Sequence, residues 1–199
     1  MRKIYILLTD TGTLFTKAIK CFTRCPLNHA SIAFDETLED LYSFGRKNER
    51  NPFIGGFVRE NIHSNLFRNA KCAIYSCSVS DLEYSHIMRE IRTIEQNQQN
   101  YKYNLIGLFG VMVNKEINRK HAFFCTLFVA SILIRSGVNI IEKPACLVKP
   151  NDIIQAKQLK LEFEGVLDTY PKVKIRMEKP HTRVGETVRT AFRKVRAYI

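Results

Sequence analysis

Cys125 is the residue of this sequence whose type and position best suit nucleophilic chemistry. It stands in the stretch HAFFCTLFVASILIRSGV, residues 121–138, where apolar side chains at helical spacing predict a helix over 123–136 that Gly137 ends. A buried cysteine is usually a small hydrophobic side chain. At a helix N-terminus, however, unpaired N–H groups and the helix dipole stabilise a thiolate and can bind an oxyanion. The position therefore indicates a reactive thiol.

A thiolate nucleophile needs a base, and His29 is the histidine whose surroundings fit best. It begins HASIAF, residues 29–34, a short run of small and apolar residues that predicts a strand. A lone histidine at a strand start is often structural, but the combination with Cys125 favours a catalytic pair. The other histidines lie just before the Cys125 helix, in a polar loop, on a polar helix and in a basic tail (His121, His63, His86 and His181).

Metal and nucleotide chemistry find less support in the sequence. Cys21, Cys25 and His29 are spaced like metal ligands, but Pro26 interrupts any helix there, and neither a fourth ligand nor a CxxC pair accompanies them. There is also no P-loop, GxGxxG or HExxH motif. We therefore expect no metal site and no cofactor.

The elements around these residues predict an α+β fold with a central antiparallel sheet. Strands are expected at 3–8, 29–34, 41–45, 70–79 and 160–170, and the second and third form a hairpin over the turn 35–40. Helices are expected at 14–22, from a capping box at Ser80 and Glu83 to about residue 98, at 103–113 and at 123–136. Residues 46–70, which contain Pro52, Gly55 and Gly56, are expected to form a long loop or small insertion.

The order of the two motifs resembles a known superfamily. NHASIAFDETLEDLYSFGRK, followed much later by FFCTLFVASILIRSGV, resembles the permuted branch of the NlpC-type papain-like cysteine peptidases and amidases, which includes the lecithin:retinol acyltransferase-like proteins. In that branch the histidine strand precedes the cysteine helix. The resemblance covers roughly residues 3–140. It implies a permuted papain-like fold, with Cys125 as nucleophile and His29 as base.

The resemblance also implies a polar third residue on the strand after the histidine strand. The best match is Ser43 in EDLYSFG, which departs from the usual amide, imidazole or carboxylate and brings no charge to an imidazolium. Glu60 in GGFVRE is the second candidate, since a carboxylate could fold back from the expected loop. Tyr103 in YKYNLIGLFG resembles a tyrosine that lines the site in such enzymes, or it packs on the core as an ordinary aromatic residue.

Composition favours a domain inside the cell with a basic extension. The chain has 199 residues, six cysteines and a formal charge of +12, and its N-terminal apolar run is too short for a signal peptide. We expect a hydrolase domain over 1–171, a cytoplasmic location and a basic tail over 172–199. The tail holds nine Lys and Arg against two Glu, and Val184, Val188, Phe192 and Val195 would form one apolar stripe if it is helical. Such a tail could associate with an anionic membrane, more readily than with nucleic acid. Alternatively, its apolar stripe packs on the protein's own core and its charges are solvated.

Two functions follow for the same fold. The first is a thiol hydrolase or acyltransferase in which Cys125 attacks an amide or ester, with a peptide, isopeptide or lipid-type acyl substrate as the resemblance implies. The second is a catalytically weak or inactive binding module that the basic tail attaches to an anionic surface. The uncharged Ser43 favours the second, and the pairing of Cys125 with His29 favours the first.

Overall fold

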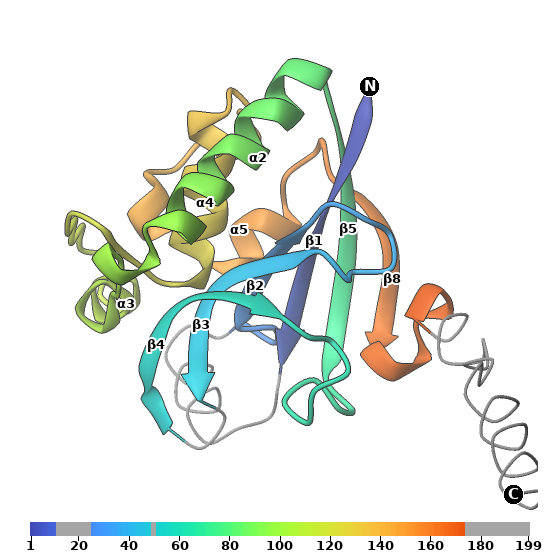
Figure 1. Cartoon of the computed structure of the whole chain (residues 1–199), viewed down its shortest axis with the longest axis horizontal. Coiled ribbons are helices and arrows are strands. Elements are labelled where there is room, and N and C mark those ends of the chain that lie inside the picture. The colour runs from blue at the N-terminus through green and yellow to red at the C-terminus, as the bar shows by residue number, and fades with distance from the viewer. Residues whose placement is uncertain (11–24, 49–50, 174–199) are drawn as a thin grey trace, which may run out of the picture.

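A six-stranded antiparallel sheet forms the centre of the computed structural model, which describes residues 1–10, 25–48 and 51–173 (Figure 1). Its strand order is β4-β3-β2-β1-β5-β8. The strands are β1 (Arg2–Asp10), β2 (His29–Ala33), β3 (Leu41–Asn48), β4 (Asn51–Glu60), β5 (Lys71–Val79) and β8 (Lys160–Val166). This arrangement confirms the α+β class and the central antiparallel sheet.

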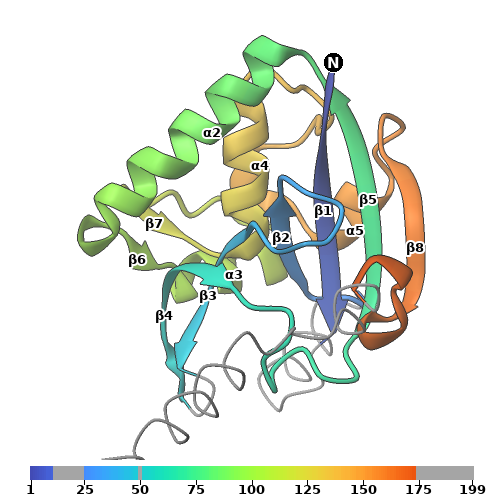
Figure 2. The ribbon, with the colours of Figure 1, turned by 45° about the vertical axis from the view of Figure 1, so that its right-hand side comes forward.

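Helices cover one face of this sheet, where α4 packs on β2 and β3 and α2 packs on α4 (Figure 2). The α-helices are α2 (Asp81–Gln96), α3 (Leu105–Met112), α4 (Cys125–Arg135) and α5 (Pro150–Ile154). Short 3₁₀ turns occupy Gln98–Asn100, Ala145–Leu147 and Leu167–Thr169. A two-stranded parallel ribbon, β6 (Lys102–Tyr103) with β7 (Ala122–Phe123), leads the chain into α4.

Alternation along the strands divides the core between the two faces of the sheet. On β2, Ala30 and Ile32 pack towards the helices, whereas Ala33 packs into a second cluster on the other face. The second cluster is closed by the turn after β2, the segment after β4 and the chain beyond β8, and includes Leu38, Phe67 and Tyr170. The strand β2 is therefore buried on both faces, and only its first residue, His29, lies at the sheet margin with partial exposure.

Several predicted boundaries are confirmed and others are wrong. The hairpin of β2 and β3 is present, with Ile32 opposite Tyr42, and the capping box at Ser80 begins α2. Residues 46–70 are not one loop, because β3 continues to Asn48 and β4 follows it. The helix expected over 103–113 begins only at Leu105, since residue 103 belongs to β6.

Some predictions lie outside the described residues or at their edge. The helix over 14–22 and the apolar stripe of the tail are outside the described ranges. The first two residues of the expected tail still belong to the body: Lys172 Nζ lies 3.2 Å from Glu36 Oε1, and Val173 is buried in the second cluster. Within the described ranges, no helix combines the length and apolar character needed to cross a bilayer.

Candidate active site

Cys125 lies at the N-terminus of its helix, as predicted, but α4 begins at Cys125 itself, two residues later than the predicted start. Phe124 occupies the N-cap position in an extended conformation and supplies no side-chain cap to the first turn. The earliest backbone N–H groups of an α-helix have no intrahelical partner, so the start of α4 can present N–H donors to an anion. The thiol is 7% exposed, and its Sγ lies 3.9 Å from the carbonyl oxygen of Asn28, the residue before His29.

The first turn of α4 is held in place by contacts that do not involve the thiol. Thr126 Oγ1 donates to the carbonyl oxygen of Val148 at 2.6 Å, and α4 is buried from Cys125 to Leu133. Gly137, in a left-handed conformation with φ of +86°, ends the segment as predicted. The position of Cys125 is therefore determined by core packing along the whole helix.

His29 and Glu60 form a largely buried pair, although the strand register sets Glu60 level with Ala33, at the other end of β2 from His29. The ring Nε2 of His29 lies 2.7 Å from Glu60 Oε1, and the two side chains are 16% and 6% exposed. His29 opens β2 and Glu60 closes β4, with β3 lying between these two strands. Because Nε2 is engaged by the carboxylate, Nδ1 is the ring nitrogen left for the thiol.

Two serine hydroxyls hold the Glu60 carboxylate. Ser43 Oγ donates to Oε1 at 2.8 Å, and Ser31 Oγ donates to Oε2. A Cβ atom at Gly45 would lie 3.2 Å from Ser43 Oγ and 3.3 Å from His29 Cε1, so glycine leaves room there for the serine hydroxyl and the imidazole. The imidazole thus has a charged partner that is itself fixed by hydrogen bonds.

Electrostatics within the cluster favour a charged imidazole. Burial works against the imidazolium, but the Glu60 carboxylate, together with a hydrogen bond to Cys125 and the charge of that sulfur, raises the pKa of His29 to about 10. Burial likewise works against the Glu60 carboxylate, yet the charge of His29 and the hydrogen bonds from His29, Ser31 and Ser43 lower its pKa. The arrangement can therefore hold an imidazolium beside a thiolate.

Tyr103 lies near the sulfur and packs against β4. A Cβ atom at Gly55 would lie 2.8 Å from Tyr103 Cγ, so the ring rests directly on the strand backbone. Burial and, second, the charge of Cys125 raise the pKa of Tyr103 well above its usual range, and the phenol keeps its proton. A neutral phenol near the sulfur is a hydrogen-bond donor within the site.

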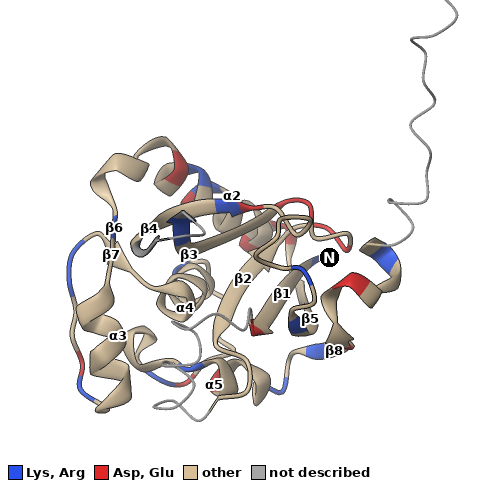
Figure 3. Cartoon of the chain, turned by 90° about the horizontal axis from the view of Figure 1, so that it is seen from below, with Lys and Arg blue, Asp and Glu red and all other residues tan. Residues whose placement is uncertain are grey.

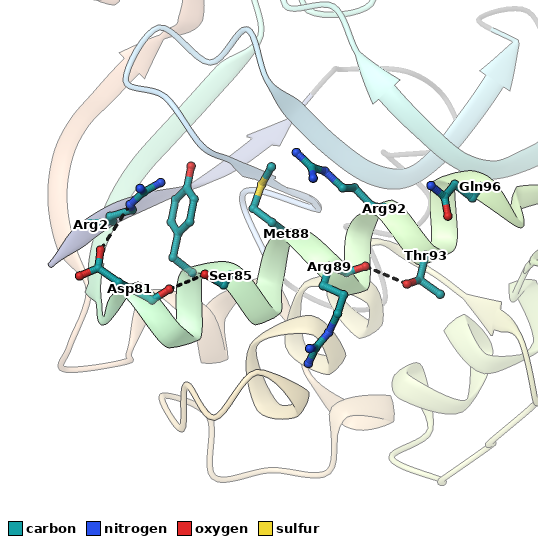
Figure 4. A pocket seen from close by; sticks show the side chains of 9 residues that line it. Arg2, Asp81, Ser85, Met88, Arg89, Arg92, Thr93 and Gln96 are labelled. Carbon is teal, nitrogen blue, oxygen red and sulfur yellow. Dashed lines mark hydrogen bonds and ion pairs between the residues drawn. The ribbon is translucent and has the colours of Figure 1, made fainter.

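A small apolar cavity of about 10 Å³ lies on the other side of Cys125, towards α3 and α5. Its lining includes Leu108, Val111, Phe124 and Val148. A larger polar hollow of about 640 Å³ runs along α2, lined by side chains that include Arg2, Tyr84, Met88 and Arg92 (Figure 4). The larger hollow includes neither Cys125 nor His29, so its size does not make it the candidate site.

The structure brings Cys125, His29 and Glu60 together, and it alters the expected third position. The predicted contact between Ser43 and the imidazole is wrong, since Ser43 reaches Glu60 and Glu60 reaches the ring. Ser43 does share a face with His29, as predicted. Ser31 was not among the predicted site residues, although its position two residues after His29 places it on the same face of β2.

Within the described residues, no group of three or more His, Cys, Asp and Glu side chains is arranged to hold a metal ion. Comparison with known proteins adds no further assignment: no family model, no curated protein and no solved structure matches this chain.

Proposed function

We propose that this protein is a thiol hydrolase or acyl-transferring enzyme of the permuted NlpC-type papain-like kind. The observation that carries the proposal is the connected series Cys125–His29–Glu60, contributed by α4, β2 and β4. A nucleophile, a base and a group that orients the base are the parts that thiol catalysis needs. The proposed triad therefore contains Glu60 in place of Ser43.

The proposed reaction begins with attack on a carbonyl. The Cys125 thiolate forms a bond to the carbonyl carbon, and the negative oxygen is held by N–H groups at the start of α4. The phenol of Tyr103 is a second candidate donor. As the tetrahedral intermediate collapses, the His29 imidazolium gives its proton to the leaving amine or alcohol, which leaves a thioester on Cys125.

The second half-reaction releases the acyl group. Neutral His29 takes a proton from water, or from another acceptor, as that nucleophile attacks the thioester carbon. Collapse of the new intermediate expels the thiolate of Cys125 beside the re-formed imidazolium. Glu60 keeps the ring oriented and stabilises its charge in both halves, without taking the proton itself. Amides, isopeptides and lipid esters are the substrate classes proposed.

Selective alkylation tests whether the thiolate is activated. The full chain is treated with substoichiometric iodoacetamide and labelled positions are mapped by mass spectrometry. We expect Cys125 to react first among the six cysteines, and the matched variant His29→Asn to lose this preference. Equal labelling of all accessible thiols, unchanged by His29→Asn, would contradict the proposal.

A second experiment separates an enzyme from an inactive binding module of the same fold. An activated p-nitrophenyl ester should give a burst of one nitrophenolate per chain, and intact-mass measurement should show the acyl group on Cys125. The variant Cys125→Ala should give no burst. If Cys125 is alkylated selectively but no ester or amide tested gives an acyl-enzyme, the result would favour the binding module.

A further inference from the structure

The segment between β6 and β7 forms a closed excursion that carries α3 away from the sheet (Figure 3). Its two ends are joined by backbone hydrogen bonds: Lys102 N donates to His121 O at 2.8 Å, and Asn104 N donates to Phe123 O at 2.9 Å. Asn104 also caps α3, because its Oδ1 accepts from Gly107 N at 2.9 Å. The excursion is therefore an ordered unit that begins and ends beside the entry to α4.

One face of this unit is apolar and open to solvent. Ile106 and Phe109 on α3 and Val113, the residue that follows its last turn, are 54%, 62% and 71% exposed, and their spacing of three and four residues places them on one side. We call these three residues the α3 face. Single exposed apolar residues need no explanation, but three large ones on one helical side form a patch of the kind used for binding.

The opposite side of the same helix forms part of the cavity at the nucleophile. Leu108 and Val111 are buried, and both line the small apolar cavity that Cys125 also lines. The α3 face therefore lies one helix diameter, roughly 10 Å, from the wall of that cavity.

Basic side chains lie on the same excursion as the α3 face. Lys115 N donates to Gly110 O at 2.8 Å, and this bond folds the following loop back against α3. A Cβ atom at Gly110 would lie 2.6 Å from the Lys115 carbonyl oxygen, so glycine permits the close approach. The excursion carries four exposed cations against the single acid Glu116, and none of the four has an acidic partner among the described residues: Lys102, Lys115, Arg119 and Lys120.

We propose that the α3 face inserts into the surface of an anionic phospholipid bilayer. The three apolar side chains would enter the boundary between headgroups and acyl chains. The four cations of the excursion would contact anionic headgroups. A second copy of this chain fits the surface less well, because pairing two α3 faces about a two-fold axis brings two sets of like charges together.

Vesicle co-sedimentation of the full chain tests the proposal. Phosphatidylcholine vesicles are compared with vesicles that also contain phosphatidylglycerol, at low and high salt. We expect binding to the anionic vesicles that weakens as salt increases. The double variant Ile106→Ser/Phe109→Ser should reduce partitioning about tenfold or more, because both side chains would otherwise leave water.

The matched control replaces two exposed leucines elsewhere, Leu82→Ser/Leu161→Ser, which are 66% and 46% exposed. It should bind as the unmodified chain does. Equal binding by the α3 variant would overturn the proposal and assign any membrane contact to another part of the chain. Absence of binding by the unmodified chain would also overturn it.

Two further measurements separate this proposal from its alternatives. Light scattering after size-exclusion chromatography should show that the unmodified chain is a monomer. If it is a dimer and the α3 variant is a monomer, the α3 face would instead be a self-association surface. Vesicle binding is repeated with Cys125→Ala, which should bind as the unmodified chain does. Vesicle co-sedimentation measures binding and not catalysis. Failure of the proposed thiol chemistry would therefore leave the vesicle result unchanged, and failure of membrane binding would leave the alkylation result unchanged.

Discussion

Cys125 and Cys72 are both buried cysteines, with 7% and 1% exposure, but their neighbours differ. Cys72 lies on β5 in the second core cluster, where burial, helped by the nearby carboxylates Asp168 and Glu164, raises its pKa to about 12. Cys125 instead lies at a helix start beside His29, whose imidazolium would stabilise a thiolate. Under the proposed function, the two buried thiols would therefore differ in reactivity through the sign of the nearest charge rather than through burial.

Removal of the His29 imidazole should have the largest effect on the difference in reactivity between Cys125 and Cys72. We expect His29→Asn to lower ester turnover by on the order of 10³-fold, because the thiolate loses its partner and the leaving group loses its proton donor. Alkylation of Cys72 in the same samples, followed by mass spectrometry, serves as an internal reference and should not change. If Cys125 kept its alkylation rate in this variant, the two cysteines would differ by exposure only.

Replacement of Glu60 should have the next largest effect on activity. Glu60→Gln keeps the shape but removes the charge that orients and stabilises His29⁺, and we expect a loss in turnover of about 10²-fold. A pH profile of Cys125 alkylation should also show His29 titrating at lower pH in the variant. An unchanged profile would mean that the carboxylate contributes to structure alone.

The same pair should give a pH-dependent contribution to stability. The pKa of His29 rises from 6.5 on folding, so its contribution is complete below pH 6.5 and is lost as pH rises towards 10. The pKa of Glu60 falls from 4.5, so its contribution is complete above pH 4.5 and is lost in more acidic solution. The free energy of unfolding in urea should therefore differ most between Glu60→Gln and the unmodified protein from pH 4.5 to pH 6.5, where the variant should be less stable by about 3 kcal/mol. A constant difference from pH 5 to 10 would contradict this linkage.

Tyr103→Phe should affect turnover but not alkylation. If the phenol donates to the oxyanion, its loss should lower ester turnover about tenfold or more, whereas iodoacetamide produces no oxyanion and should react as before. Gly55→Ala is the matched control, because its methyl group would displace the Tyr103 ring and leave the phenol hydroxyl present. Equal turnover in Tyr103→Phe and the unmodified chain would assign the tyrosine to packing.

Ser43→Ala should have the smallest effect. Glu60 would lose one of its two serine donors and keep its contact with His29, so we expect turnover to fall by about threefold. Ser31→Ala removes the other donor and should behave similarly. A loss as large as that of Glu60→Gln would show that Ser43 has a role beyond holding the carboxylate.

The sequence was sufficient to predict the residues whose signals are local. Cys125 and His29 stand at the first positions of a helix and a strand, and the periodicity that follows predicts the strand start at His29 and the helix start within two residues of Cys125. The capping box of α2 and Gly137 were predicted for the same reason. Such signals need only a few neighbouring residues.

Glu60 could not be placed first because its role depends on the pairing of distant strands. Pro52, Gly55 and Gly56 are typical of loops, yet the backbone is held in β4 by its partner β3, which overrides the local preference. Only the register, with Glu60 opposite Leu41 and Val58 opposite Ser43, shows that the carboxylate lies on the face of His29. A register of this kind cannot be read from the spacing of residue types.

The succession of β2, β3 and β4 has a consequence for the order of folding. His29 and Glu60 are 31 residues apart in a meander of adjacent strands, whereas Asn28 and Cys125 are 97 residues apart. Contacts of short sequence separation require less loop-closure entropy and form sooner on average. We therefore expect a nascent chain to assemble the His29–Glu60 pair first and to bring in Cys125, the proposed nucleophile, only when α4 docks. A chain interrupted before residue 125 would hold His29 and Glu60 without the Cys125 thiol, so the proposed reactivity would wait until synthesis has passed most of the domain.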